Sequence, residues 1–286
     1  MNEVASIDPG QPLVSICIPS FRGAAYLGAT IESVLAQSHA NWELRIVDDA
    51  SPDATAAVVA RYDDPRIRFV ANATNLGPQG NWNRCLALAR GKYYKLLPQD
   101  DLLAAGSLAE HVAVLEGDAK GEIALVFGSR LIIDHDGRVV FRRGLPRSAA
   151  GRIDGRRLVR RCVRAGTNLI GEPGNGLMRR SLAERIGTYS TEHPYMVDLD
   201  YWFRALACGD GYYTGHRSSS FRISPGSWSV ALGRRQLADF NGFVRKYAAD
   251  GRYGITRADR WLGFTKARVN TFGRAVIYRS LFRHPR

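Results

Sequence analysis

Cysteine is scarce in this sequence, and the cysteines are not arranged in pairs. Four of the 286 residues are cysteine, with no Cys-x-x-Cys spacing: Cys17, Cys85, Cys162 and Cys208. The six histidines show no His-x₃-His or Glu-x₂-His spacing. Structural zinc sites and disulfide frameworks depend on such patterns. Neither is expected here, and the cysteines are interpreted as reduced.

Long apolar runs are also missing. No window approaches the roughly 18 to 20 uninterrupted apolar residues that a membrane-spanning helix requires. The first twelve residues contain Glu3 and Asp8 and lack the basic start and apolar run of a signal peptide. We therefore expect no transmembrane segment, an N-terminal tail over residues 1–12, and a cytoplasmic location.

Acidic residues are few relative to basic ones. The chain has 27 Asp and Glu against 40 Lys and Arg, which gives a formal charge of +13. Such a balance favours an anionic partner, such as phospholipid, nucleic acid or a phosphorylated substrate. Much of the excess lies at the C-terminus, where eight Arg or Lys residues between positions 257 and 286 face one acid, Asp259.

Apolar strands alternate with amphipathic helices in the first half of the chain. Strands are predicted over residues 13–18, 43–47, 66–71 and 93–97, with helices between them. This alternation predicts an α/β fold with a mostly parallel sheet, covered on both faces, whose ligands bind at the carboxyl ends of the strands. Residues 19–22, 48–51 and 99–101 should therefore converge on one crevice.

The alternation ends in the second half. A strand over residues 123–127 is followed by a predicted hairpin over 131–141 that turns near 135–137. Residues 142–194 contain many Gly, Arg and Pro and are expected to form short elements and loops. A helix is predicted to begin near Asp198, and two more helices to follow Ser229.

Two acidic pairs stand directly after apolar strands: Asp48 with Asp49, and Asp100 with Asp101. Carboxylates at strand ends can hold Mg²⁺ or Mn²⁺ against the phosphates of a substrate. An Asp in this position can also cap the next helix or form a turn. Both interpretations remain open from the residues alone.

Several motifs, in this order and spacing, resemble the family 2 glycosyltransferases, which have the GT-A fold. The similarity covers residues 13–230, and its segments are residues 14–21, 33–37, 42–51, 75–77, 81–83, 91–93, 97–102, 171–173, 198–204 and 221–229. It implies a Rossmann-like GT-A domain with a nucleotide-sugar half (13–130) and an acceptor half (131–230). Residues 231–286 would then form a basic, helical C-terminal extension.

The resemblance places the nucleotide-sugar donor on named residues. It implies that Pro19, Ser20 and Phe21 line the nucleobase and ribose pocket. Asp49, together with Asp48, would accept a hydrogen bond from the base, which suits the imide N–H of uracil or thymine and hence a UDP- or dTDP-sugar. Two further residues, Asn75 and Asn83, are expected near the nucleotide.

The resemblance also implies a metal, Mn²⁺ or Mg²⁺, on the donor diphosphate. Asp100 aligns with the second acid of the family's Asp-x-Asp motif, and Asp101 is next to it. The first acid of that motif is Pro98 here, so Gln99 is expected to reach the ribose instead. Ser224 replaces a histidine that could be a third protein ligand. Metal binding therefore rests on Asp100, Asp101 and the donor's phosphates.

Asp198 occupies the position of the family's catalytic base, which implies an inverting displacement at the sugar's anomeric carbon. From the residues alone, capping of a helix is an equal explanation. Asp200 is the local competitor, but two residues along a helix it points elsewhere. The residue before the base, often Glu in the family, is Val197. Arg204 and Arg222 would assist the phosphates or simply pair with acids.

The overall prediction is a glycosyltransferase acting on a saccharide or lipid-linked acceptor in cell-surface polysaccharide or glycolipid assembly. One alternative is a nucleotidyltransferase that acts on sugar phosphates, although no glycine-rich phosphate loop follows the first strand. A non-enzymatic nucleic-acid-binding protein is the other alternative. The basic charge lacks a nucleic-acid motif, and strand-end acids would repel phosphates, so we expect no nucleic-acid partner.

Basic charge and apolar residues coincide in the C-terminal segment, where Trp261, Val269, Phe272 and Val276 share one helix face. This pattern is typical of a helix that lies on the inner face of the cell membrane and contacts anionic lipid. It also suits a helix whose apolar face packs on the catalytic domain. A second basic run, residues 157–164, would either attract a phosphorylated acceptor or form a solvated helix face.

Overall fold

The computed structural model describes residues 10–282. Its strands form one mixed sheet in the order β3-β2-β1-β4-β9-β6-β10-β5, with β7 paired to β6 and β8 to β10. The strands are β1 (Val14–Ser20), β2 (Trp42–Asp48), β3 (Ile67–Ala71), β4 (Tyr93–Leu96), β5 (Leu102–Leu103), β6 (Ile123–Ile133), β7 (Val139–Arg143), β8 (Gly151–Ile153), β9 (Gly176–Arg179) and β10 (Asp210–Arg222).

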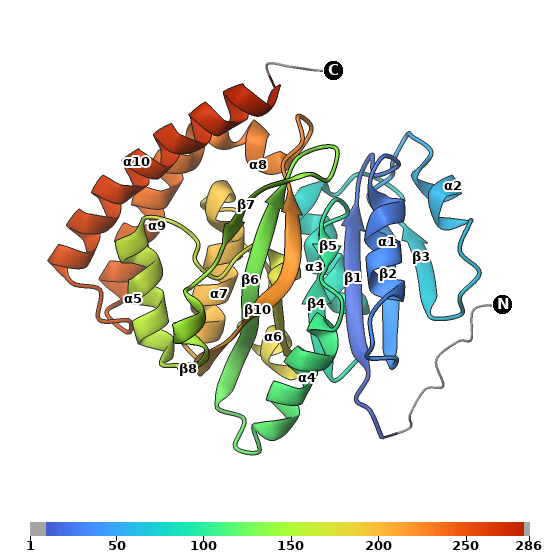
Figure 1. Cartoon of the computed structure of the whole chain (residues 1–286), viewed down its shortest axis with the longest axis horizontal. Coiled ribbons are helices and arrows are strands. Elements are labelled where there is room, and N and C mark those ends of the chain that lie inside the picture. Colours follow the sequence, from blue (N-terminus) through green and yellow to red (C-terminus); the bar gives the residue numbers. More distant parts are fainter. Residues whose placement is uncertain (1–9, 283–286) are drawn as a thin grey trace.

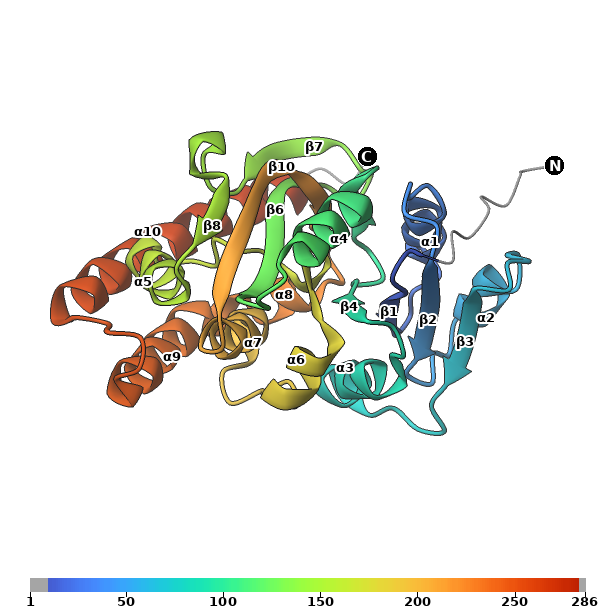
Figure 2. The ribbon, with the colours of Figure 1, turned by 90° about the horizontal axis from the view of Figure 1, so that it is seen from below.

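The predicted parallel half of the sheet is confirmed. β1 pairs in parallel with β2 and β4, and β2 with β3. All seven residues of β1 are buried, as expected for a strand covered on both faces. The helices of this half are α1 (Leu27–Leu35), α2 (Thr55–Val59), α3 (Gly77–Leu88) and α4 (Ser107–Gly117). α1 and α4 cover one face, and α3 covers the other (Figure 2).

The second half differs from the prediction in three ways, of which the first is β10, a thirteen-residue strand that was not predicted. The strand over 123–127 and the first arm of the hairpin are one continuous strand, β6, which reaches Ile133 before the chain turns and returns as β7. The loop-rich stretch contains an eleven-residue helix, α5 (Gly155–Ala165). Its apolar residues Leu158, Val159 and Val163 are buried, and arginines fill most of its outer face. A helix face was one of the two alternatives predicted for residues 157–164, and the helix is confirmed.

The remaining helices are α6 (Arg180–Ile186), α7 (Val197–Leu206), α8 (Trp228–Ala231), α9 (Gln236–Asp250) and α10 (Arg257–Phe282). Short 3₁₀ turns lie at Arg147–Ala149, Pro173–Asn175, Pro194–Met196 and Gly233–Arg235. The helix predicted near Asp198 and the two C-terminal helices are thus present. α9 buries Phe240, Phe243 and Val244 in the same apolar core as α7, so it continues the core of the expected acceptor half, residues 131–230.

α10 runs along the outer edge of the molecule beside α5 and α9 (Figure 1). Two glycines let α10 and α5 approach closely. A Cβ on Gly263 would lie 2.3 Å from the carbonyl oxygen of Val163, and one on Gly166 2.4 Å from the backbone nitrogen of Ala267. Gly166 also has a φ of +64°, which L side chains rarely adopt. The inner face of α10 therefore lies against the domain.

The predicted apolar stripe of α10 is on the opposite, outer face. Trp261, Val269, Phe272 and Val276 are 71%, 68%, 73% and 50% exposed. The expectation that this stripe packs on the catalytic domain is therefore wrong, because the inner contacts are made by other residues such as Ala267 and Asn270. Across residues 10–282, no helix combines the length and apolar character needed to cross a bilayer.

Candidate functional site

The loops after β1, β2 and β4 meet at one edge of the sheet, as predicted. The backbone N–H of Asp49 donates to the carbonyl of Ser20 at 2.8 Å, and that of Arg22 donates to the hydroxyl of Ser51 at 2.9 Å. Arg22 and Ala50 have φ values of +54° and +57°, which non-glycine residues rarely adopt. Such strain is concentrated at binding loops, which supports a ligand site here.

Gln99 fixes the loop after β1. Its side-chain oxygen accepts from the Ser20 hydroxyl and the Phe21 N–H, and its amide nitrogen donates to the Phe21 carbonyl at 2.9 Å. These bonds hold the amide against the loop, a positioning role for the residue expected to reach the ribose. Phe21 is 40% exposed, so its ring is available to a nucleobase. Pro19 and Ser20 are buried in β1.

The two acids after β2 have different environments. Both carboxylate oxygens of Asp48 accept from Ser51, one from its N–H at 2.9 Å and one from its hydroxyl at 2.6 Å. Asp48 thus forms the turn that was the alternative interpretation for these acids. Asp49 accepts through Oδ1 from the amide of Asn72 at 2.7 Å and the N–H of Leu76 at 2.8 Å. These bonds fix the Asp49 carboxylate.

The asparagines near the nucleotide loops are mainly structural. Asn75 donates to the Asp49 carbonyl at 3.1 Å, which places it at the site. Asn83 accepts from the N–H of Tyr189 at 2.8 Å, so its amide joins α3 to the acceptor half. The buried Asn72 and Asn81 bond to each other and to this edge of the sheet, and neither was selected from the sequence. Asn81 lay within a motif of the resemblance and was therefore detectable.

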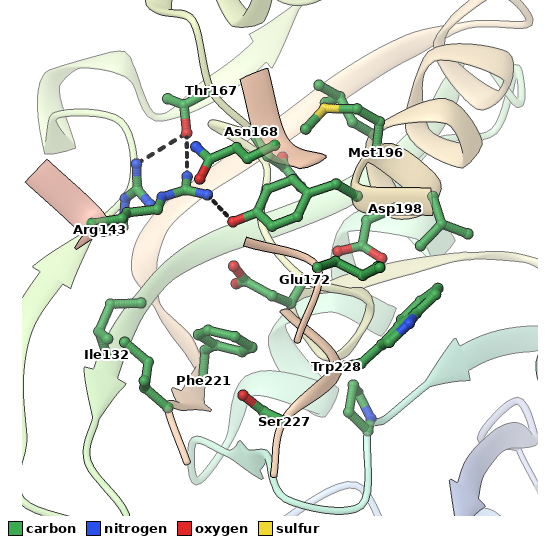
Figure 3. A pocket seen from close by; sticks show the side chains of 18 of the residues that line it. Ile132, Arg143, Thr167, Asn168, Glu172, Met196, Asp198, Phe221, Ser227 and Trp228 are labelled. Carbon is green, nitrogen blue, oxygen red and sulfur yellow. Dashed lines mark hydrogen bonds between the residues drawn. The ribbon is translucent and has the colours of Figure 1, made fainter. Parts of the chain in front are cut away.

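A cavity of about 180 Å³ opens beside these loops. Asp100, the expected metal ligand, and Asp198, the expected base, both line it. Pro98, Phe221 and Trp228 contribute apolar walls. The inner face of α10 closes one side through residues such as Arg274 and Ile277. Figure 3 shows Asp198 and Glu172 extending toward the same space. Donor-side and acceptor-side residues therefore share one cavity.

Asp198 lies in the first turn of α7 and does not cap it. The cap residue is Met196, and no side chain makes a capping bond there. Burial, followed by the negative charge of Glu172, raises the pKa of Asp198 to about 8, while Arg130 acts in the opposite direction. The competitor Asp200 is buried elsewhere, bonded to Arg204 at 2.9 Å and to Tyr247 at 2.8 Å. Of the two acids, Asp198 alone lines the cavity.

Asp100 and Asp101 follow β4 as predicted. Burial raises the pKa of Asp100 to about 6, and burial together with the charges of Asp100 and Glu172 raises that of Asp101 well above its usual range. Oδ1 of Asp101 accepts from the N–H of Arg222 at 3.1 Å. Within residues 10–282 no group of three His, Cys, Asp or Glu side chains could hold a metal. Two adjacent carboxylates could nevertheless suit a hard divalent cation that is also held by substrate phosphates, although the charge of Arg222 already acts on Asp100.

Three residues missed from the sequence complete the charge pattern: Glu172, Arg130 and Arg143. Glu172 forms an ion pair with Arg130, in which Oε2 of Glu172 lies 2.5 Å from Nε of Arg130. The Arg130 side chain is 1% exposed. Glu172 lay in a motif of the resemblance, Gly171–Pro173, although no role was assigned to it. Arg130 and Arg143 belong to β6 and β7, and no local pattern distinguishes them from the other arginines of this basic chain.

The remaining arginines singled out from the sequence have structural partners. Arg222 donates to the backbone carbonyls of Asp100, Asp134 and His135. Arg204 pairs with Asp200. In the run over 157–164, Arg160 and Arg164 pair with the buried Asp259 of α10 at 2.9 and 3.6 Å. That run therefore helps to attach α10 to α5. Arg283 and Arg286 of the basic tail lie outside the described residues, as do residues 1–9.

Comparisons with known proteins agree with this architecture. The sequence model described as "Glycosyl transferase family 2" matches residues 15–187. An uncharacterised protein of Mycobacterium tuberculosis is 33% identical over 249 residues, which cover 83% of this chain and 76% of that protein. The UDP-Glc:α-D-GlcNAc-diphosphoundecaprenol β-1,3-glucosyltransferase WfgD of Escherichia coli is 35% identical over 124 residues, covering 43% of this chain and 48% of that enzyme.

The fold matches solved structures as well. Staphylococcus aureus TarS in complex with UDP-GlcNAc superposes with a TM-score of 0.60 at 16% identity, over 79% of this chain and 66% of that chain. At this identity the likeness establishes the fold, which is GT-A-like with a helical C-terminal region. The match to WfgD spans about half of that enzyme's length.

Proposed function

The chain belongs to glycosyltransferase family 2, and we propose that it transfers a sugar from a UDP- or dTDP-sugar to a hydroxyl of a saccharide or lipid-linked acceptor, with inversion at the anomeric carbon. One observation carries this proposal. A carboxylate with a raised pKa, Asp198, lines the same cavity as Asp100, which follows a parallel strand beside the strained loops. Asp198 as the proposed base and Asp100 as the donor-side acid thus line one cavity.

The reaction is a single displacement. Asp198 accepts the proton of the acceptor hydroxyl as the hydroxyl oxygen forms a bond to C1 of the donor sugar. The bond from C1 to the diphosphate oxygen breaks at the same time, and the nucleoside diphosphate leaves with that electron pair. A carboxylate whose pKa lies near neutrality suits this role, because a base is most effective when its pKa is close to the working pH.

Asp100, with Asp101 beside it, would hold Mn²⁺ or Mg²⁺ together with the donor's phosphates. When bound, such a cation neutralises charge on the leaving diphosphate. The fit rests on the two adjacent acids after β4. Burial raises the pKa of Asp100, against the charge of Arg222, and burial together with the charge of Asp100 raises that of Asp101. On the nucleotide side, the exposed ring of Phe21 and the fixed carboxylate of Asp49 would bind the base.

The donor and acceptor classes are supported by the relatives. WfgD is named for a UDP-Glc donor and a diphosphoundecaprenol-linked acceptor, and a TarS crystal contains UDP-GlcNAc. For this chain we propose a UDP- or dTDP-sugar donor and an acceptor of cell-surface polysaccharide or glycolipid assembly. The exposed apolar residues of α10, flanked by Lys266, Arg268 and Arg279, would hold the enzyme on the inner face of the cell membrane.

A panel of UDP- and dTDP-sugars tests this proposal. The purified chain is incubated with each donor, with and without Mn²⁺, and release of nucleoside diphosphate is followed. We expect release with at least one donor, stimulated by Mn²⁺ and lost in Asp198→Asn when an acceptor is present. Consumption of a nucleoside triphosphate with a sugar phosphate, and of no nucleotide sugar, would instead show a nucleotidyltransferase and overturn the proposal.

A further inference from the structure

Two arginines from distant parts of the chain converge on one hydroxyl at the cavity. Arg143, at the end of β7, donates to Oγ1 of Thr167 at 3.1 Å, and Arg274 of α10 donates to the same oxygen at 2.9 Å. Arg274 also donates to the hydroxyl of Tyr195. Figure 3 shows these bonds at the rim of the cavity that contains Asp198.

These guanidinium groups lack counter-ions. Within residues 10–282 no carboxylate lies within 4.0 Å of a side-chain nitrogen of Arg143 or Arg274, while Glu172, the acid that acts on Arg143, is paired with Arg130. Nη1 of the buried Arg130 has no hydrogen-bond partner among the described residues. Burial, then the charges of Arg274 and Arg130, lowers the pKa of Arg143 to about 10. Among the described residues, Glu172 is thus the one carboxylate ion-paired with these three adjacent guanidinium groups, so positive charge is in excess.

We propose that Arg143 and Arg274, with Tyr195 and the charge of Arg130, form a subsite for a phosphoryl group of the acceptor. This inference rests on the proposed function, since it names the acceptor's class. Guanidinium groups bind phosphate oxygens through paired N–H donors, and a site with excess positive charge is stabilised by an anionic ligand. None of these residues belongs to the donor-side loops.

The surroundings identify the rest of the acceptor. Ile132, Phe141 and Ile277 line the cavity together with the two arginines, so apolar surface adjoins the positive charge. Asp198 lines the same cavity, which lets a hydroxyl reach the base while the phosphoryl group binds the arginines. A lipid-linked sugar phosphate has this sequence of groups: an apolar chain, a phosphoryl group and a sugar hydroxyl. The subsite therefore selects a phosphorylated lipid carrier.

Binding of four probes to the full chain tests the subsite without requiring turnover. The probes are octyl phosphate, octanoate, octyl glucoside and inorganic phosphate, and the dissociation constants are measured by titration calorimetry below the micelle concentration. We expect octyl phosphate to bind most tightly, because only it combines an alkyl chain with a phosphoryl group. Equal binding of octyl glucoside would overturn the proposal. Tightest binding of octanoate would replace phosphate by carboxylate, and tightest binding of inorganic phosphate would exclude the lipid.

Variants assign the binding to the arginines. Arg143→Gln leaves the bonds from Arg274 to Thr167 and Tyr195 in place, so α10 stays docked, and we expect octyl phosphate to bind about tenfold more weakly or worse. Arg274→Lys keeps the positive charge but loses the paired N–H donors of the guanidinium group. It should weaken octyl phosphate binding less than Arg143→Gln does. Arg61→Gln, at an exposed arginine outside both the cavity and α10, is the matched control with the same change in net charge.

Unchanged binding in folded Arg143→Gln, judged by its circular dichroism and melting temperature, would overturn the subsite. The proposed function fails separately. If no nucleotide sugar is turned over while octyl phosphate still binds through Arg143, the subsite stands and the reaction is wrong. If donors are turned over but octyl phosphate binds the native protein and Arg143→Gln equally, the reaction stands and the acceptor assignment is wrong.

Discussion

Asp198 lies in the first turn of α7 without capping it, so its conservative substitution should affect chemistry and little else. In Asp198→Asn the amide keeps the shape of the side chain but cannot accept the acceptor's proton. We expect donor affinity to be retained and kcat to fall by about 10² to 10⁴. Steady-state kinetics and donor titration measure the two quantities. Retained kcat with collapsed donor affinity would show that Asp198 binds the donor and that the base lies elsewhere.

The raised pKa of Asp198 predicts the pH dependence of the rate. Only the deprotonated carboxylate can act as a base, and burial and Glu172 raise its pKa to about 8. Below that value the active fraction falls about tenfold for each pH unit. We therefore expect kcat/KM for the acceptor to rise from pH 6 to about pH 8 and then level off. A profile that is flat between pH 6 and pH 8 would contradict this assignment.

Glu172 is expected to set the position of that profile. Its charge raises the pKa of Asp198, so Glu172→Gln should lower that pKa and move the acid limb of kcat/KM toward lower pH. Glu172 and Arg130 are the charged groups that act on Asp198. The charge of Asp198 in turn raises the pKa of Asp101. The same change leaves the buried Arg130 without its ion pair, which costs about 3 to 5 kcal/mol when a partner is removed. Profiles must therefore be taken below the variant's melting temperature, and an unmoved limb in folded protein would contradict the role.

Asp100 gives the corresponding prediction for the donor. Its side chain lies at a strand end and makes no hydrogen bond that holds the core together, so Asp100→Ala should fold normally. We expect it to lose Mn²⁺-dependent turnover and the enhancement of donor binding by Mn²⁺. Titration with the nucleoside diphosphate, with and without the metal, separates the two effects. Undiminished Mn²⁺-dependent turnover in the variant would disprove the metal assignment.

The sequence could predict these acids because each follows a recognisable local pattern. Asp100 comes after an apolar strand, and Asp198 begins a helix within a family motif. Arg143 and Arg274 carry no such pattern, since 131 residues separate them and each is one of many arginines. Their significance depends on which arginines lack an acid, and that is decided by the tertiary contacts that bring Arg143 and Arg274 to Thr167. For Asp48 the residue pattern left a turn and a ligand role open, and the structure shows the turn bonds to Ser51.

At the scale of elements, the exposed face of α10 predicts membrane binding. Its apolar residues point away from the domain, and basic residues next to an anionic bilayer contribute about 1 kcal/mol each. We expect the protein to co-sediment with anionic vesicles, to be released by salt, and to lose binding in the double variant Val269→Ser and Phe272→Ser. Neither side chain is part of the core, so the fold should be unaffected.

The matched control for that experiment is Val139→Ser. Val139 is 59% exposed on β7 and is not part of α10, so its substitution should leave vesicle binding unchanged. Equal recovery of the native protein in the supernatant with neutral and anionic vesicles would show that the outer face of α10 does not bind lipid. Binding that persists in the double variant would assign it to another surface.

The close approach of α5 and α10 predicts a stability difference between two glycines of one helix. Gly263→Ala places a Cβ 2.3 Å from the Val163 carbonyl, and the resulting overpacking costs about 1 to 3 kcal/mol. Gly273 has no atom within 4 Å of a built Cβ, so Gly273→Ala should stabilise the protein by about 0.5 to 1 kcal/mol. Denaturant unfolding measures both changes. If Gly263→Ala did not lower the free energy of unfolding, α10 would not pack on α5 in solution.

Element prediction succeeded where one pattern extended over an entire element. The buried parallel strands were predicted to within one or two residues because their apolar runs end at polar strand ends. Helix α5 was expected only as one of two alternatives for residues 157–164, because its five arginines equal its five apolar residues in number. Burial shows that Leu158 and Val163 belong to one continuous face. The face of α10 could not be assigned from sequence, because an apolar stripe suits either a protein or a lipid surface.

At the scale of the whole molecule, α10 lines the proposed active-site cavity as well as forming part of the surface. Ala267, Arg274 and Ile277 line the cavity, so removal of the residues after Gly254 would open the site as well as remove the exposed face. We expect such a truncation to lose transfer to the acceptor in detergent solution, where no membrane is present. Full activity of the truncated protein, measured with a water-soluble acceptor, would show that α10 is an independent appendage.

The two faces of α10 also restrict how the chain can change in length. Each residue turns an α-helix by about 100°, so one residue inserted between Trp261 and Arg274 would rotate everything after it by that angle. Arg274 would then leave the cavity, and Phe272 would turn away from the outer surface. Insertions in the connection between α9 and α10 carry no such penalty, because they do not alter the phase of the helix. Natural variation in length should therefore collect at residues 251–256 and be absent from 261–274.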